Sequence, residues 1–245
     1  MPPAITTSGL TKRFGKTVAL DGLTIEVEAG EVFGFLGPNG AGKTTTLRLL
    51  MSMLRPTSGA AAVLGLDPWS DAVALHRRVA YVPGDAEVWP NLTGREMLEF
   101  LGRIHGDIDI AYRDELIERF DFDPDKKGRS YSKGNRQKIA LIAALMTRAE
   151  LLLLDEPTSG LDPLMEMTFR DEIRVAADRG QTTFLSSHIL SEVDALCTTV
   201  AILRAGRLVE EATIGDLKRV YAAKQRGGRE PSLEEIFLTY YGRDG

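Results

Sequence analysis

A glycine-rich segment at residues 37–45, GPNGAGKTT, contains residue types that can bind phosphate groups. Four residues separate Gly37 from Gly42, and Lys43 and Thr44 follow directly. This is the spacing of the P-loop, in which backbone N–H groups point at phosphate oxygens because glycine has no side chain in the way. The lysine reaches the outer phosphates, and the threonine hydroxyl can ligate Mg²⁺. The segment therefore predicts a site for a nucleoside triphosphate.

The residues on either side of this segment support the prediction over a chance match. Residues 31–36, EVFGFL, form a short apolar run, and Leu47, Leu49 and Leu50 follow the loop in a helix-like pattern. Strand, loop and helix in this order are the context that a P-loop requires.

The segment LLLLDEPTSGLD, residues 151–162, supplies carboxylates for a hydrolysis site. Its leucines suit a strand that is buried on both faces of a parallel sheet, and ligands gather at the carboxyl ends of such strands. Asp155 is predicted to hold Mg²⁺ through water, and Glu156 to orient the attacking water. Because leucine also favours helices, a helix followed by an acidic turn is the alternative, against which Pro157 indicates a sharp stop.

A histidine is expected beside the terminal phosphate. The β-rich run TTFLSSH, residues 182–188, ends in His188, whose side chain would lie at a strand terminus. His76 and His105 are interpreted as ordinary surface or core residues, because most lone histidines have no functional role.

Residues 131–138, YSKGNRQK, place three cations directly before the apolar run at 139–146. If that run is a helix, its N-terminus already carries a partial positive charge. The additional cations therefore predict that an anion docks on this turn.

Taken in order, these segments resemble the ATP-binding cassette (ABC) family, specifically a nucleotide-binding subunit, and the resemblance covers nearly the whole chain. It implies that Glu156 is the catalytic base and that His188 is the switch histidine. Phe14, in KRFGK, matches the aromatic residue that stacks on adenine. Residues 159–162, SGLD, match the D-loop, which crosses to the partner subunit.

The resemblance implies ATP and Mg²⁺ as cofactors and assigns site residues one by one. The nucleotide-binding residues are Phe14, Gly37, Pro38, Asn39, Gly40, Ala41, Gly42, Lys43, Thr44 and Thr45. The metal ligands are Thr44 and, through water, Asp155, with Asp85 as a further candidate. The D-loop residues are Ser159, Gly160, Leu161 and Asp162.

The cationic segment at 131–138 falls where the family has its signature motif, usually written LSGGQ. In the family this motif caps the γ-phosphate of ATP held by the opposite subunit, which implies contacts to the partner's nucleotide from Ser132, Lys133, Gly134 and Asn135. This chain has Lys at 133 in place of Gly, and Asn at 135 in place of Gln. The anion that meets this turn is thus expected to be a triphosphate of a second subunit.

A further departure lies in AYVPGDAEVWPNLTG, residues 80–94. The family usually has Gln or Glu after the proline, where this chain has Gly84. Asp85, one residue later, is the candidate replacement ligand, and the identity of this ligand stays open at this point.

The expected fold is α/β, with a P-loop NTPase (RecA-like) core of mostly parallel strands, an N-terminal antiparallel β part and an inserted α-helical subdomain. The core is assigned to residues 1–83 and 150–212, the helical subdomain to 84–149 and a C-terminal helical tail to 213–245, all within one cassette of residues 1–245.

Several helices are predicted directly from the sequence. Residues 93–106 begin with Thr93 and Glu96 in capping-box spacing and continue with apolar residues at helical intervals. Residues 114–122, DELIERFDF, are predicted as a second helix. In the tail, two short helices are predicted at 213–224 and 232–242, on either side of QRGGREP.

Composition limits the classes of function. The net charge is −5 and no basic block stands out, so no nucleic-acid partner is expected. No uncharged apolar run reaches the roughly 18 to 20 residues that span a bilayer, and residues 1–7 lack the features of a secretory signal. A cytoplasmic protein is expected, peripheral at the membrane through a partner. The single Cys197 is interpreted as an inert core thiol.

The leading functional hypothesis is an ATPase motor. Two cassettes clamp two ATP molecules head to tail, and a separate membrane-spanning permease converts their opening into export. The chain resembles most the ATPase subunits of ABC-2 type and multidrug exporters, and either a homodimer or a heterodimer is possible. One alternative is a soluble ABC ATPase that acts on nucleic acid or ribosomes, but such proteins usually have coiled-coil insertions or zinc-binding cysteines. The other is a GTPase, which needs an Asn-Lys-x-Asp motif that this chain lacks.

The segment that faces the permease in the family contains Trp89, Pro90 and Leu92. We expect this apolar cluster to be a docking surface. The alternative is that these side chains only pack the helical insert.

Overall fold

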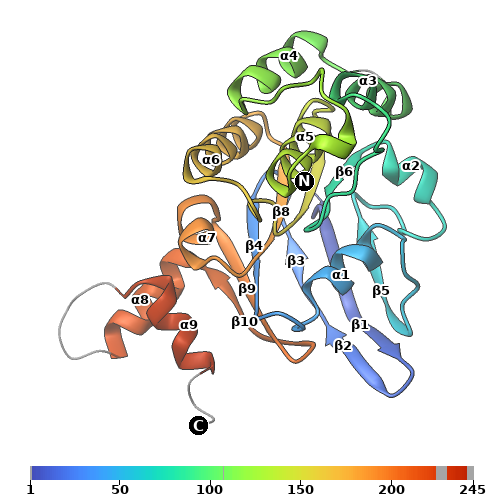
Figure 1. The fold of residues 1–245 in the computed structure, drawn as a ribbon. Helices are drawn as coiled ribbons and strands as arrows, with labels where there is room; N and C mark the ends of the chain where they lie inside the picture. Colours follow the sequence, from blue (N-terminus) through green and yellow to red (C-terminus); the bar gives the residue numbers. More distant parts are fainter. Residues whose placement is uncertain (1, 107, 225–230, 242–245) are drawn as a thin grey trace.

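A six-stranded sheet forms the centre of the molecule in a computed structural model that describes residues 2–106, 108–224 and 231–241 (Figure 1). The strand order is β10-β9-β4-β8-β7-β6, and all strands run parallel except β10 at one edge. The strands are β4 (Val32–Leu36), β6 (Val79–Val82), β7 (Leu151–Asp155), β8 (Thr182–Ser187), β9 (Thr199–Arg204) and β10 (Arg207–Thr213). The predicted mostly parallel sheet is confirmed.

A second, antiparallel sheet forms from the N-terminal part of the chain. Strand β1 (Ile5–Phe14) pairs with β2 (Thr17–Leu23), β3 (Glu26–Val27) and β5 (Ser58–Val63), always in the antiparallel sense. Apolar side chains of β1, of α1 (Lys43–Leu50) and of one face of the parallel sheet share a single core. The predicted N-terminal antiparallel part is therefore confirmed.

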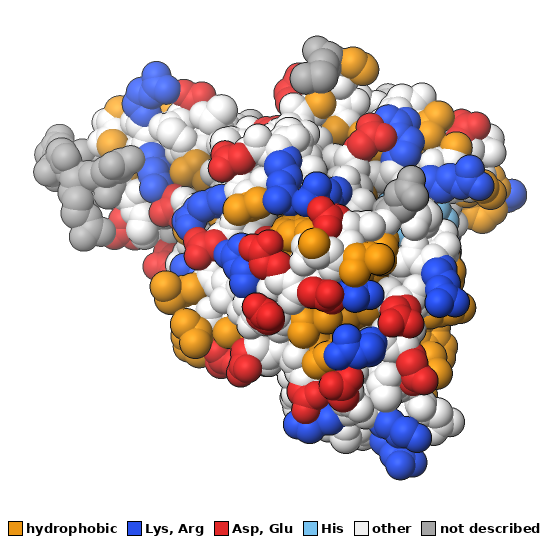
Figure 2. Space-filling model, turned by 90° about the horizontal axis from the view of Figure 1, so that it is seen from above, with side chains coloured by type: hydrophobic (Ala, Val, Ile, Leu, Met, Phe, Trp, Pro, Cys, Tyr) orange, Lys and Arg blue, Asp and Glu red, His pale blue; other side chains and the backbone are white. Residues whose placement is uncertain are grey.

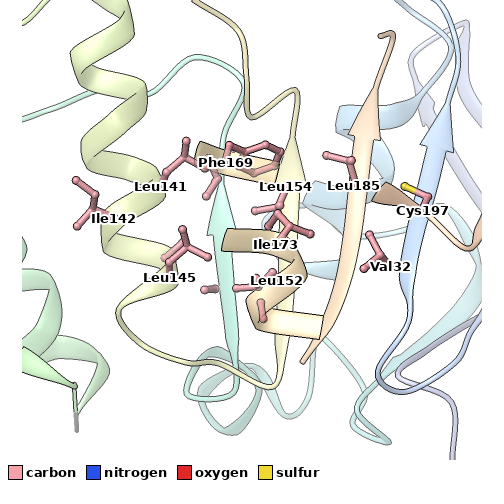
Figure 3. Close-up of a cluster of buried hydrophobic side chains, with 14 of the residues drawn as sticks. Val32, Leu141, Ile142, Leu145, Leu152, Leu154, Phe169, Ile173, Leu185 and Cys197 are labelled. Atoms are coloured by element: carbon pink, nitrogen blue, oxygen red, sulfur yellow. The ribbon is translucent and has the colours of Figure 1, made fainter. Parts of the chain in front are cut away.

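Strand β7 shows why four consecutive leucines form a strand here. Leu151 and Leu153 lie in the core shared with the antiparallel sheet, whereas Leu152 and Leu154 lie in the core on the opposite face. Figure 3 shows this second core, where Leu152 and Leu154 pack near helical side chains that include Phe169. A strand buried on both faces has no polar face, which accounts for the uninterrupted run of leucines and excludes the helical alternative.

Three helices of the insert lie together at one end of the sheet: α3 (Gly94–His105), α4 (Ile110–Arg119) and α5 (Lys133–Leu145) (Figure 1). The predicted capping box of α3 is confirmed, because Thr93 Oγ1 accepts from the Glu96 N–H at 3.2 Å and the Glu96 carboxylate accepts from the Thr93 N–H at 2.7 Å.

The prediction of a helix over 114–122 is wrong in its bounds. Helix α4 begins at Ile110, because the Asp109 carboxylate accepts a hydrogen bond from the Tyr112 N–H at 3.0 Å and caps the helix. It ends at Arg119, and Asp121 adopts a left-handed conformation with a φ of 45°. The capping aspartate lies outside the charged stretch from which the helix was predicted.

An ion pair with one buried partner joins α4 to α6 (Pro163–Asp178). The Glu172 side chain is 0% exposed, accepts a hydrogen bond from Tyr112 Oη at 2.6 Å, and forms an ion pair with Arg119. Arg148 and Arg179 stack on the Tyr112 ring, with guanidinium carbons 5.1 and 4.7 Å from its centroid. Burial, and then the hydrogen bond to Glu172, raise the pKa of Tyr112, so its hydroxyl stays a donor.

The C-terminal helices α8 (Ile214–Lys224) and α9 (Leu233–Tyr241) agree with the two helices predicted in the tail. Of the segment QRGGREP between them, residues 225–230 lie outside the described part of the chain. The remaining helices are α2 (Ala72–His76), α7 (Leu190–Leu196) and a 3₁₀ turn at Gly128–Ser130.

Two further observations concern the surface and the single thiol. On the face seen in Figure 2, acidic and basic side chains are interspersed, with hydrophobic side chains between them. None of the helices in the described ranges is long and apolar enough to cross a membrane. Cys197 is buried, and burial raises the pKa of its thiol, as expected for an inert core residue.

Candidate nucleotide site

The glycine-rich loop connects β4 to α1, and two of its glycines are required by close backbone contacts. A Cβ added at Gly37 would lie 2.6 Å from the Leu203 carbonyl oxygen. A Cβ added at Gly42, which has a φ of +112°, would lie 2.6 Å from the Ala19 carbonyl oxygen. Helix α1 begins at the next residue, so its N-terminal N–H groups face the loop, which suits an anion.

Lys43 is buried at the start of α1, with 5% of its side chain exposed. Its ammonium group donates to the carbonyl oxygens of Gly37 at 2.7 Å and Pro38 at 3.3 Å. Its Nζ also lies 3.4 Å from Glu156 Oε1. The cation is therefore held at the centre of the loop.

The two predicted carboxylates lie at the carboxyl end of β7. Asp155 Oδ1 accepts a hydrogen bond from Ser186 Oγ at 3.0 Å. Glu156 adopts a left-handed φ of 47°, a conformation that costs on the order of 1–3 kcal/mol for such a residue. A hydrogen bond from its N–H to the Ser186 carbonyl oxygen, at 2.8 Å, holds it there.

His188 follows β8, the strand next to β7, and is about half exposed. Its Nδ1 lies 3.3 Å from Glu156 Oε1. Three segments that are far apart in the sequence therefore meet at the carboxylate of Glu156, where Lys43 and His188 both lie near Oε1.

A cavity of about 670 Å³ is lined by half of the predicted site residues, and His188 is not among them. Those that line it are Asn39, Gly40, Gly42, Lys43, Thr44, Thr45, Asp85, Lys133, Asp155, Glu156 and Ser159. Phe14 lies outside this lining and is about half exposed, with the Lys12 ammonium 5.1 Å from its ring centroid.

The cavity also contains residues that were not predicted from the sequence: Thr17, Val18, Ala19, Arg48, Tyr81, Pro83 and Gly84. Two signals could have revealed some of them. Arg48 is four residues after Thr44 and so lies on the same face of α1. Tyr81 precedes the carboxyl end of β6, which is parallel to β7. Burial, and then the charge of Asp155, raise the pKa of Tyr81.

The signature segment and the D-loop contact each other within the subunit. Ser132 is the N-cap of α5, and its hydroxyl accepts from the Asn135 N–H at 3.2 Å. Lys133 Nζ donates to Ser159 Oγ at 2.9 Å. Asp162 caps α6 by accepting from the N–H groups of two residues in its first turn.

Gly84 touches the end of β7, since a Cβ added there would lie 3.1 Å from the Asp155 carbonyl oxygen. A side chain at this position would need the strand end to shift by a few tenths of an ångström. Asp85 lines the same cavity as Thr44 and Asp155.

A sequence profile described as ABC transporter matches residues 20–159, which is more than half of the chain. The chain belongs to the ABC transporter family. Over 220 residues, this ABC protein is 41% identical to the daunorubicin/doxorubicin resistance ATP-binding protein DrrA of Streptomyces peucetius, covering 88% of this chain and 67% of that protein. It is 38% identical to the bacitracin transport ATP-binding protein BcrA of Bacillus licheniformis, covering 89% of this chain and 72% of that protein.

A solved ATP-binding subunit of an ABC transporter has the same fold. Its TM-score is 0.87 at 26% identity, over 97% of this chain and 99% of that chain. The predicted family and the predicted P-loop NTPase fold are both confirmed. The ABC chain is accordingly an ATPase, and the nucleotide that the P-loop was predicted to bind is ATP.

Proposed function

We propose that this ABC ATPase is the motor subunit of an exporter whose membrane-spanning permease is a separate chain. The convergence of Lys43 and His188 on Glu156, within 3.4 and 3.3 Å of the same carboxylate oxygen, is the observation that carries the hydrolytic half of this proposal. The transport half is supported by relatives whose names refer to drug resistance and to bacitracin transport.

In this proposal the loop at 37–45 binds the phosphates of ATP, and the Lys43 ammonium neutralises charge on the outer phosphates. Glu156 accepts a hydrogen bond from the attacking water and orients it, and His188 holds the carboxylate and the terminal phosphate in place. Phe14 provides an exposed ring for the adenine. The other proposed nucleotide-binding residues are those of the loop at 37–45.

A magnesium ion fits the donor set of the cavity. Thr44 and Asp155 bring a hydroxyl and a carboxylate to the same cavity, and hard oxygen donors are those that Mg²⁺ prefers. Within the described ranges, no three His, Cys, Asp or Glu side chains form a metal-binding group, so phosphate oxygens and water would complete the shell. When bound, Mg²⁺ neutralises charge on the β- and γ-phosphates. Asp85 is the proposed additional ligand.

The working unit in this proposal is a dimer. The signature residues Ser132, Lys133, Gly134 and Asn135 meet the ATP of the partner subunit, and the D-loop residues 159–162 cross the interface. The position of the signature segment at the N-terminus of α5 supports this role, because N–H groups at a helix start bind phosphate well.

The permease is proposed to dock in an apolar groove of about 550 Å³ between α2, α3 and α5. Trp89 lines it, is about half exposed, and packs edge-on against Phe100 with 5.5 Å between ring centroids. Pro90 is also exposed, whereas Leu92 packs against the core and so contributes to the insert rather than to the surface. Docking there would hold the subunit at the cytoplasmic face of the membrane.

The test is the molar mass of the Glu156→Gln variant, measured by light scattering with and without MgATP. The variant should bind ATP, hydrolyse it very slowly and double its mass when MgATP is added. Lys43→Ala is the matched control and should stay monomeric. A Glu156→Gln variant that binds ATP yet remains a monomer would contradict a homodimer and would leave a heterodimer with a different cassette.

A further inference from the structure

Lys133, where the family pattern has glycine, contacts the D-loop of its own subunit. Its ammonium donates to Ser159 Oγ at 2.9 Å. Its methylene groups cover Gly160, because a Cβ added at Gly160 would lie 3.4 Å from both Cγ and Cδ of the lysine. The backbones also meet, since a Cβ added at Gly134 would lie 2.6 Å from the Gly160 carbonyl oxygen. The start of α5 and the D-loop are packed directly together.

Ser159 is connected in turn to the catalytic carboxylate. Its N–H donates to the Glu156 carbonyl oxygen at 3.1 Å, closing a turn over residues 156–159. Lys133 and Ser159 line the same cavity as Lys43 and Glu156. A continuous series of contacts therefore runs from the signature segment to the residue that orients the attacking water.

We propose that Lys133 is a positioning residue for ATP hydrolysis. By holding Ser159, it couples the signature segment, which meets the partner's nucleotide, to Glu156, which acts on the subunit's own nucleotide. This inference rests on the role proposed above for the signature segment. A glycine at position 133 has no side chain that could donate to Ser159, so the coupling requires the lysine.

The physical basis is geometric. A hydrogen bond with a charged donor is shorter and stronger than a neutral one, and it orients the D-loop hydroxyl toward the start of α5. A small displacement of a catalytic group is enough to slow a reaction. Any displacement of the start of α5 would therefore be transmitted through the lysine to Ser159 and to the turn that begins at Glu156.

The test is a double-mutant cycle on steady-state hydrolysis of MgATP. Lys133→Met keeps the aliphatic stem over Gly160 but removes the donor, and Ser159→Ala removes the acceptor. Each should lower kcat about three- to tenfold with KM changed by less than about twofold, and the double variant should match the single variants. Lys133→Arg should restore most of the rate, because a guanidinium group can still donate. Lys126→Met, at an exposed lysine of the same insert, should have wild-type kcat.

A second measurement separates positioning from phosphate binding. In the Glu156→Gln background, Lys133→Met should still dimerise with MgATP, because Ser132, Gly134 and Asn135 remain to meet the partner's ATP. A wild-type kcat for Lys133→Met, additive losses in the double variant, or loss of the MgATP-dependent dimer on adding Lys133→Met would each overturn the positioning role. If the parent Glu156→Gln variant fails to dimerise, that result contradicts a homodimer and not the role of Lys133. The double-mutant cycle on kcat does not use the Glu156→Gln variant, so it still tests Lys133 on its own.

Discussion

Glu156 Oε1 lies 3.3 Å from Nδ1 of His188, and this contact joins the ends of the adjacent strands β7 and β8. Both side chains are partly open to solvent, with exposed fractions of 28% and 51%. The pair is therefore accessible to a water molecule and to a phosphate, and its geometry is fixed by two buried strands rather than by a loop alone.

Replacement of His188 by alanine should lower kcat for ATP hydrolysis about 100-fold, because the Glu156 carboxylate loses a neighbour that holds its orientation. KM for MgATP should change little, since the phosphate loop is untouched. Phosphate release under saturating MgATP measures this. His105→Ala, at a histidine that lines the apolar groove, is the control and should keep wild-type activity. Equal losses in both variants would assign the effect to folding.

Asp85→Asn should raise the Mg²⁺ concentration needed for half-maximal ATPase activity about tenfold, because the substitution removes one carboxylate from the proposed metal site. The matched control is Glu87→Gln, because Glu87 lies in the same segment but lines two other cavities. Titration of Mg²⁺ at fixed ATP gives the answer. An unchanged Mg²⁺ requirement would limit the protein's metal ligands to Thr44 and Asp155.

Trp89→Ala should weaken binding to the permease about 30-fold while ATP binding stays the same, because large aromatic side chains dominate interface energetics at about 2 kcal/mol or more each. The chain has only one other tryptophan, Trp69, whose ring packs under the Arg55 guanidinium at 4.2 Å. Trp69→Ala is the matched control. Binding to the permease in nanodiscs separates the two variants, and loss of ATP binding in Trp89→Ala would indicate a folding defect.

Glu192 should make stability depend on pH. Its side chain is almost fully buried, it accepts a hydrogen bond from Ser187 Oγ at 2.8 Å, and burial raises its pKa above the ordinary 4.5. The folded state therefore binds this proton more tightly than the unfolded state. That contribution to stability is fully present below pH 4.5 and is lost as pH rises through the raised pKa.

Glu192→Gln removes this titration. Urea unfolding of both proteins is measured from pH 4.5 to 8. As pH rises, the free energy of unfolding of the variant should increase relative to that of the wild type. Glu99→Gln, at an exposed position on α3, should follow the wild type at every pH. Parallel curves for wild type and Glu192→Gln would show that this carboxyl does not titrate differently on folding.

Much of the fold and of the site could be predicted from contiguous segments. The loop at 37–45, the strand of four leucines and the capping box at Thr93 each contain their own signal, because the residue types that each one needs lie within a few residues of one another in the sequence. The run ending in His188 could be predicted as a strand for the same reason.

The contacts that depend on how strands and helices assemble could not be predicted. Arg48 and Tyr81 enter the cavity only because α1 and β6 lie beside it in space. The hydrogen bond from Lys133 to Ser159 joins two segments whose adjacency no local pattern reveals. The start of α4 was missed because one side chain, Asp109, determines it.

The ion pair between the buried Glu172 and the partly exposed Arg119 limits how the molecule can move. Pulling α4 away from α6 would break this ion pair and also the hydrogen bond that Tyr112 donates to the buried carboxylate. The two helices are therefore expected to turn as one rigid lever. Because Asp162, the last D-loop residue, caps the start of α6, a push on the helical insert is transmitted along that lever to the loop that crosses to the second subunit.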